Sequence, residues 1–241
     1  MAVRGPEWDR QPTCADHRRP REYPSRALIT VRTGVAAILA SVLVAGCGGG
    51  GGETSTAASL PAGCTQVQKP APKDVHLTRP TTTLRGPATA TVETSCGRFA
   101  IALDVARAPK TASSFAYLAR RGVYDDTVFH RIVPGFVIQG GDPTGTGGGG
   151  PGYFVDEPPP SDLSYTQGIV AMAKTAAEPP GRSGSQFFVV TVPDAGLTPD
   201  YALVGRVSSG FDVVQRIEQL GTPGGAPRAP VVIRRVTIQG G

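Results

Sequence analysis

A single arginine, Arg131, lies among Phe, Ile and Val residues in the stretch from Phe129 to Asp142, which has the sequence FHRIVPGFVIQGGD. In an extended chain successive side chains alternate between faces, so Phe129 and Arg131 share one face while His130 takes the other. Such an arginine is often a solvated edge residue or an ion-pair partner. A guanidinium is also a permanently charged fork of donors, and it can therefore stabilise a lone pair that develops during a reaction.

Two nearby motifs suggest other chemistry. Residues 145–150, GTGGGG, satisfy the pattern G-x-G-x-x-G, but they run into Pro151 rather than into a helix, so they do not predict a nucleotide site. Residues 181–185, GRSGS, resemble the nucleophile elbow of a serine hydrolase, except that Ser185 replaces the second glycine. A hydrolase would need a base near Ser183 or Ser185, and a fluorophosphonate label would detect it.

A second stretch gives Arg131 its context. The residues AMAK (171–174) are followed by a polar, glycine-containing loop and then by GSQFF (184–188). Together with FHRIVPGFVIQGGD, these motifs resemble the cyclophilin family of peptidyl-prolyl cis/trans isomerases in order and spacing, over about residues 90 to 239. The resemblance implies a mainly β fold: a closed eight-stranded antiparallel barrel capped by two α-helices, with a substrate groove on its outer surface. It implies no metal and no cofactor.

The resemblance also assigns roles to residues. Arg131 matches the family's catalytic arginine, and Gln139 matches the glutamine that holds the substrate backbone and orients the arginine. Ala173 and Lys174 would contact the residue before proline through their backbone, and Gln186 would extend the polar side of the groove. The pocket for the proline ring would be lined by Phe136, Val137, Phe188 and Leu197, with Tyr201 beside it.

Several positions depart from the best-known eukaryotic pattern. Val137 replaces a common methionine, Lys174 an asparagine, and Tyr201 a frequent histidine, while Ala195 or Gly196 stands where a tryptophan favours cyclosporin binding. We expect isomerase activity to survive these changes and cyclosporin binding to be weak. The positive charge of Lys174 beside the groove suggests a preference for acidic substrates. We interpret His130 as a packing residue.

The periodicity of the chain agrees with a mainly β fold. Eight or so strand-like runs, TVFHRIV among them, alternate with glycine- and proline-rich loops. Helices are predicted from Pro109 to a stop at Gly122, and from about Asp212 to Leu220. So many short strands with only two helices favour a closed antiparallel barrel, which leaves no exposed sheet edges. Acidic residues in turn-rich loops, Glu157 among them, are expected to be solvated.

The first 46 residues resemble a lipoprotein signal peptide. Residues 34–46 form an uncharged apolar run, too short to span a membrane, that ends in small residues before Cys47. In such signals the leader is cleaved before the cysteine and the sulfur is acylated, so we expect a protein anchored to the membrane through Cys47, on the extracytoplasmic face of a bacterial cell membrane. Translation starting near Val31 rather than Met1 would leave a more compact signal.

Residues 47–88, rich in Gly, Thr, Ala, Pro and Lys, predict a flexible tether, and residues 89–241 the isomerase domain. Cys64 and Cys96 are available to form a disulfide in an oxidising compartment, and no Cys/His cluster suggests a metal site.

The net charge and the motifs of the sequence limit which classes of binding partner are expected. The net charge of +5 is concentrated in the leader, and no basic run with interleaved aromatic residues occurs, so nucleic acid is not an expected partner. Proline-containing polypeptides are the expected substrates, and exported proteins the expected clients. The alternative is a non-catalytic module that binds proline peptides in the same groove.

Overall fold

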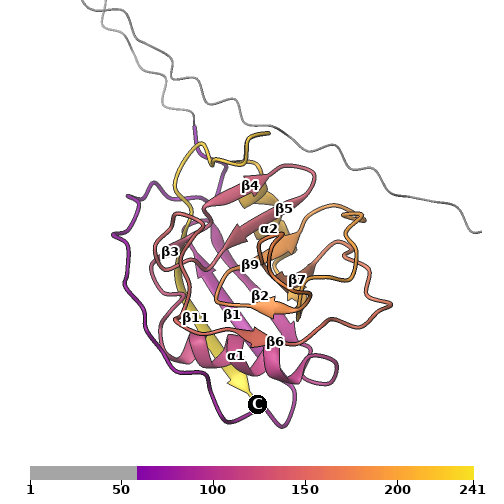
Figure 1. Ribbon diagram of the computed structural model, residues 1–241. Coiled ribbons are helices and arrows are strands. Elements are labelled where there is room, and N and C mark those ends of the chain that lie inside the picture. The colour runs from indigo at the N-terminus through magenta and orange to yellow at the C-terminus, as the bar shows by residue number, and fades with distance from the viewer. Residues whose placement is uncertain (1–58) are drawn as a thin grey trace, which may run out of the picture. The chain divides into compact units, whose positions relative to one another are not determined.

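The structure, a computed structural model, describes residues 59–241. These residues form one large curled sheet, a small two-stranded sheet and two helices (Figure 1). In chain order the elements are β1 (Ala88–Thr94), β2 (Gly97–Leu103), α1 (Pro109–Arg120), β3 (Thr127–Val128), β4 (Arg131–Val133), β5 (Val137–Gly140), β6 (Val155–Asp156), β7 (Ile169–Met172), β8 (Arg182–Ser183), β9 (Phe187–Val190), β10 (Leu203–Ser209), α2 (Phe211–Glu218) and β11 (Val232–Gly240).

The large sheet is antiparallel and has nine strands in the order β3-β11-β1-β2-β10-β7-β9-β5-β4. The mainly β prediction with two helices is therefore confirmed, but the closed eight-stranded barrel is wrong: the sheet is a curled half-barrel. The run TVFHRIV, expected as one strand, breaks at Phe129 and His130 into β3 and β4, which lie at opposite ends of the sheet. A single bridge joins Val128 of β3 to Asp142, just after β5, and no continuous ladder pairs β3 with β4 among the described residues.

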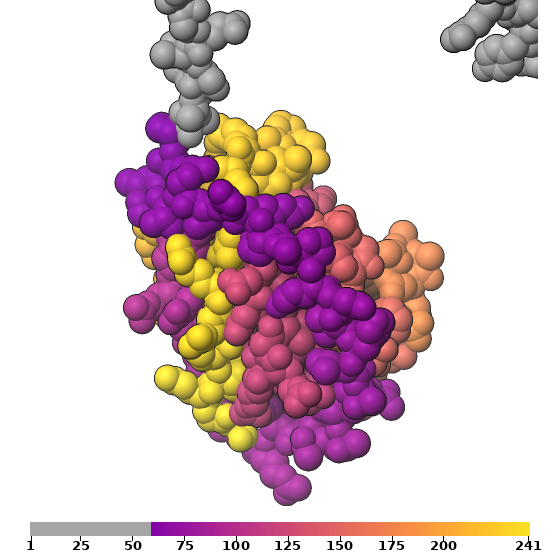
Figure 2. All heavy atoms as spheres, turned by 90° about the vertical axis from the view of Figure 1, so that its left-hand side faces the viewer, coloured from indigo at the N-terminus to yellow at the C-terminus, as the bar shows by residue number. Residues whose placement is uncertain are grey.

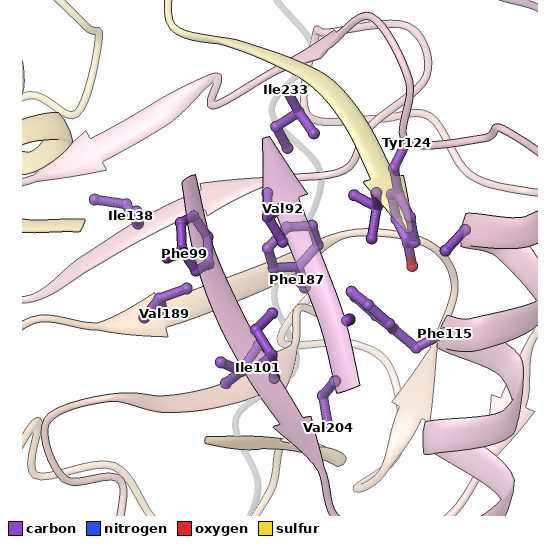
Figure 3. Packing of buried hydrophobic residues seen from close by; sticks show 14 of the residues in the cluster. Val92, Phe99, Ile101, Phe115, Tyr124, Ile138, Phe187, Val189, Val204 and Ile233 are labelled. Carbon is purple, nitrogen blue, oxygen red and sulfur yellow. The ribbon is translucent and has the colours of Figure 1, made fainter. Parts of the chain in front are cut away.

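Helix α1 packs its apolar face on the main core. Pro109 opens the helix, where its missing N–H costs nothing. Phe115 points from α1 toward Tyr124 and Phe187, with ring centroids 4.8 Å and 5.4 Å away (Figure 3). Figure 3 also shows side chains of β1 and β2 meeting these aromatic rings, so this cluster connects the helix to strands from different parts of the sheet.

The N-terminus of α1 is capped from a distant loop. The two carboxylate oxygens of Glu157 accept hydrogen bonds from the backbone N–H groups of Lys110 and Thr111, at 3.0 Å and 2.7 Å. A carboxylate here satisfies donors that the helix leaves unpaired and complements its dipole. Glu157 is therefore a structural cap, and the expectation that it would be solvated is wrong.

Residues 59–87 lie along the surface of the domain, where a free tether was expected. Figure 2 shows this indigo segment crossing one face of the molecule. Cys64 and Cys96 form a disulfide, and Thr65 N–H donates to Ser95 O at 2.8 Å. Val75 and Leu77 pack against the main core. Within residues 59–241 no helix is long and apolar enough to cross a membrane; Cys47 and the leader lie outside the described residues.

Candidate active site

The β4–β5 hairpin places Arg131 opposite Gln139. Its turn is set by local chemistry: Pro134 precedes Gly135, whose φ of +70° few other residues adopt, and Phe136 N–H donates to Val133 O at 3.1 Å. Gly135 N–H also donates to the carboxylate of a residue in α2, Glu218, at 2.8 Å. The hairpin is thereby fixed at its tip as well as along its strands.

The guanidinium of Arg131 is exposed and uncommitted. Its Cζ lies 5.8 Å from the centroid of the Phe136 ring. Among residues 59–241 no carboxylate lies within ion-pair distance of it. The interpretation of Arg131 as an ion-pair partner is therefore not supported, and its donors are available to a ligand that lies on Phe136.

A chain of amides forms the polar side of the site. Gln139 Nε2 donates to Gln186 Oε1 at 3.1 Å, and Gln186 Nε2 in turn donates to the carbonyls of Gly147 and Gly149. The two glutamines thus lie together. Gln139 orients Gln186 and, through it, residues 143–151, here called the glycine-rich loop. Among the described residues Gln139 makes no side-chain hydrogen bond to Arg131, so its expected role in orienting the arginine is not seen.

Asp142 organises that loop from within. Its buried carboxylate accepts hydrogen bonds from Thr144 N–H at 2.8 Å, Thr146 N–H at 3.0 Å and Gly147 N–H. Burial by itself would raise the pKa of Asp142, but the hydrogen bonds to its charged form outweigh this and lower the pKa. Asp142 therefore stays ionised at the centre of a folded loop. The folded loop fixes the positions of the Gly147 and Gly149 carbonyls, which accept hydrogen bonds from Gln186.

The apolar side of the site is a surface built over a second hydrophobic cluster. Phe136, Leu197 and Tyr201 are only partly covered, and Val137 and Phe188 fill the space directly below them. We call these five residues the apolar surface. The rings of Phe188 and Tyr201 meet edge to face with centroids 5.4 Å apart. The structure thus brings together all the side chains that were predicted to contact the proline ring.

Tyr165, which the sequence did not single out, holds one edge of this surface. Its hydroxyl donates to Tyr201 O at 2.6 Å and accepts from Tyr201 N–H at 2.9 Å. Burial raises the pKa of Tyr165 to about 12, so the hydroxyl remains protonated at any physiological pH. No motif in the sequence could have identified it, because its partner is a backbone segment 36 residues away.

Lys174 differs from the expectation of a free positive charge beside the groove. Its side chain is 4% exposed, and Nζ lies 2.6 Å from a carboxylate oxygen of Asp200 and 5.4 Å from the centroid of the Tyr201 ring. The ammonium is therefore neutralised, and it links residues 174–178 to the loop that carries Leu197. Ala173 uses its N–H to bond Gln186 O at 2.8 Å, so its carbonyl is the group left for a substrate.

The serine-hydrolase alternative finds no support in the geometry. Ser183 Oγ donates to Val155 O at 3.2 Å, and Ser185 Oγ is buried without a partner among the described residues. Neither serine is bonded to a histidine. In the same part of the chain no group of three metal-ligating side chains was found.

His130 lies in the break between β3 and β4, with its ring close to Gly147 of the glycine-rich loop. Its Nδ1 is buried and has no partner in the described part of the chain. Burial lowers the pKa of His130, although the nearby Asp142 raises it in part. The side chain of His130 is half-buried next to the glycine-rich loop, which agrees with its interpretation as a packing residue.

Comparisons with known proteins agree with this arrangement. The family described as cyclophilin type peptidyl-prolyl cis-trans isomerase/CLD matches residues 89–238. The chain is 43% identical over 131 residues to peptidyl-prolyl cis-trans isomerase-like 1 of Emericella nidulans, which covers 53% of this chain and 79% of that protein. It is 43% identical over 130 residues to the isomerase ppi1 of Schizosaccharomyces pombe, which covers 52% and 82%.

Solved structures lead to the same family. A cyclophilin type peptidyl-prolyl cis-trans isomerase of Cryptosporidium parvum matches with a TM-score of 0.60 and 31% identity, covering 65% of this chain and 99% of that one. A structure of the same protein in the presence of the dipeptide Ala-Pro matches with a TM-score of 0.59. The chain belongs to the cyclophilin-type peptidyl-prolyl cis-trans isomerases. These relatives are eukaryotic, and residues 1–88 lie outside the family match.

Proposed function

We propose that Arg131 is the catalytic residue and that it stabilises the twisted Xaa-Pro amide of polypeptides bound on the apolar surface. Resonance gives this amide a rotational barrier of about 18–20 kcal/mol. In the twisted transition state the proline nitrogen regains a lone pair, so a donor aimed at it stabilises that state more than either ground state. The observation that carries the proposal is the uncommitted guanidinium of Arg131 beside the Phe136 ring.

The remaining site residues supply position. The apolar surface provides a low-dielectric floor for the proline ring, which strengthens the charge–dipole contact. Gln139 and the free carbonyl of Ala173 border this floor and are available to the substrate backbone. A donor on a rigid hairpin is already oriented, so little reorganisation is needed when the amide twists.

The test is exchange NMR on an Ala-Ala-Pro-Phe peptide with the parent chain and Arg131→Ala. We expect cis/trans exchange to be about 100-fold slower in the variant, the usual loss when one transition-state donor is removed, with a smaller change in peptide affinity. Arg98→Ala, at an exposed arginine of β2, is the matched control and should exchange at the parent rate. Equal turnover in parent and Arg131→Ala contradicts the assignment.

The alternative, a module that binds proline peptides without turnover, predicts another result. Peptide resonances would shift on addition of the parent chain while the cis/trans exchange rate stayed at its uncatalysed value. The parent and Arg131→Ala would then differ only in affinity. The same experiment therefore separates the two functions.

We also propose that the protein acts on exported polypeptides while anchored through lipid at Cys47, on the extracytoplasmic face of the membrane. The apolar run 34–46 and the small residues before Cys47 support this from the sequence. The disulfide between Cys64 and Cys96 is a second support, since disulfides persist in oxidising compartments.

The membrane proposal is tested by expressing the chain in a bacterium with labelled palmitate. The parent should incorporate label and partition into detergent, whereas Cys47→Ala should do neither. Cys64→Ala is the control, because it removes a cysteine without touching the lipidation site and should still be labelled. Equal labelling of parent and Cys47→Ala contradicts the anchor.

A further inference from the structure

Residues 69–77, here called the strap, lie across the glycine-rich loop beside the active site. The strap precedes the family match, which begins at residue 89. Its register is fixed by three hydrogen bonds: Lys69 Nζ to Gly145 O at 3.1 Å, Lys73 N–H to Pro143 O at 2.9 Å and Leu77 N–H to Pro151 O at 2.8 Å.

Two further features hold the strap close to the loop. Gly152 has a φ of +87°, and a Cβ at this position would lie 3.2 Å from the Cα of His76. The ammonium of Lys73 donates to the carbonyls of Gly122 and Val123, at 3.2 Å and 2.9 Å. The strap therefore lies at van der Waals distance from the domain, and Lys73 directs its charge to these carbonyls.

The strap forms one wall of a pocket of about 600 Å³. Asp74, Val75 and His76 line one side, and Ala173 and Glu178 line another. Gln139 and Gln186 belong to the same pocket, so it adjoins the polar side of the active site. Because Gln139 pairs with Arg131 across the hairpin, a peptide bound over Arg131 can reach this pocket within a few residues at about 3.3 Å per residue.

The lining contains two carboxylates and two ammonium groups, those of Lys73 and Lys174, and these charged groups differ in their partners. The two carboxylates are those of Asp74 and Glu178. The side chain of Asp74 is 88% exposed, with His76 Nε2 beside it at 2.9 Å. Glu178 Oε2 accepts hydrogen bonds from the N–H and the hydroxyl of Thr175, which leaves Oε1 for a ligand. The nearby cations are already engaged, Lys73 by the backbone carbonyls of Gly122 and Val123 rather than by a carboxylate. Lys174 is paired with Asp200, and Arg182, which lies over Phe154, is paired with Asp156.

The pocket also offers groups that a ligand can use. Phe154, the one large hydrophobic side chain strongly exposed among the described residues, lines it and is 53% exposed. Ser185 lines it as well, and its buried hydroxyl has no partner in the described part of the chain. An aromatic ring with nearby carboxylates suits a side chain that has an aliphatic stem and a positive end.

We propose that the strap is a specificity element which selects a lysine or arginine side chain within a few residues of the substrate's proline. The stem lies against Phe154 and the charged end lies between the carboxylates of Asp74 and Glu178. The inference rests on the proposed isomerase function and deepens it. It reverses the preference for acidic substrates that the sequence suggested from Lys174.

The test compares isomerisation of peptides in which one residue, three positions before or three positions after the proline, is Lys, Ala or Glu. At low salt the parent chain should have a kcat/KM about threefold higher for a Lys peptide than for the matching Glu peptide, the size expected of partly exposed charge pairs. The ratio should approach one in Asp74→Asn/Glu178→Gln and at high salt, because exposed charges are screened. Asp74→Lys should invert it.

Asp162→Asn is the matched control, because Asp162 is exposed and does not line this pocket; it should retain the parent ratio. A parent chain that isomerises every peptide with a ratio of one overturns the specificity proposal alone. A ratio that persists unchanged in Asp74→Asn/Glu178→Gln also overturns it. A parent chain with no isomerase activity on any peptide overturns the proposed function instead.

Discussion

The chain packs its apolar side chains into two clusters that differ in what covers them. The main core is covered by α1, α2 and the segment that includes Val75 and Leu77, and its aromatic rings are fully buried. The second cluster, under the apolar surface, ends in Phe136, Leu197 and Tyr201, which are only partly covered. Complete burial stabilises the fold, whereas partial burial leaves apolar area that a ligand can still remove from water.

The largest expected effect tests the main core. Phe115→Ala removes a fully buried ring that meets two other rings, so the free energy of unfolding should fall by about 3–5 kcal/mol. Urea unfolding measures this. At a temperature where the variant is folded, its isomerase activity should match that of the parent. A variant of parental stability would show that this cluster does not carry the fold.

The next effect concerns the buried end of Lys174, which joins the second cluster to its neighbouring loop. Asp200→Asn leaves the ammonium without its carboxylate and should lower the free energy of unfolding by about 1–3 kcal/mol. Lys174→Met should cost less, since the charge then left unpaired is that of Asp200, whose side chain is 32% exposed and can be solvated, whereas the ammonium of Lys174 is 4% exposed. Thermal unfolding of both variants shows which one loses more stability. A larger loss in Lys174→Met than in Asp200→Asn would contradict the assignment of a buried ion pair.

A smaller effect tests the apolar surface itself. Leu197→Ala removes side-chain area that is only partly covered in the free protein, so the free energy of unfolding should change by less than about 1 kcal/mol. The KM for a proline peptide should rise about fivefold, because area buried against the ring is lost. Steady-state kinetics measures the change in KM, and urea unfolding of the same samples measures the change in the free energy of unfolding. A loss of stability with an unchanged KM would make Leu197 a core residue.

The smallest effect is the pH dependence of stability from His130. Its folded-state pKa is lowered by burial, so the unfolded chain binds more protons once the pH falls through about 6.5. The free energy of unfolding should therefore decrease as the pH is lowered from 7 to 5.5. His130→Gln should show a shallower decrease in urea midpoints over this range. Identical slopes in parent and variant would rule out His130 as the source.

Local patterns in the sequence determined much of the molecule. Pro109 and the apolar spacing after it set the start and buried face of α1, and Pro134 with Gly135 sets the hairpin turn. These features depend on backbone dihedral preferences and on residues close in sequence, so the chain specifies them without its tertiary context. The motif resemblance assigned Arg131, Gln139 and the apolar surface to one site. In the structure Gln139 pairs with Arg131 across the hairpin and the Phe136 ring lies beside the guanidinium, while the roles of these residues stay predictions.

Contacts between distant segments were decided only by the tertiary structure. Nothing near Glu157 indicates that its carboxylate caps α1, nor does anything near Lys174 indicate that Asp200 neutralises it. The break of one strand-like run into β3 and β4 changed a closed barrel into a half-barrel. The strap has the composition of a flexible tether, yet it lies on the domain, because its hydrogen-bond partners are backbone groups of a loop about 70 residues away, which no local pattern encodes.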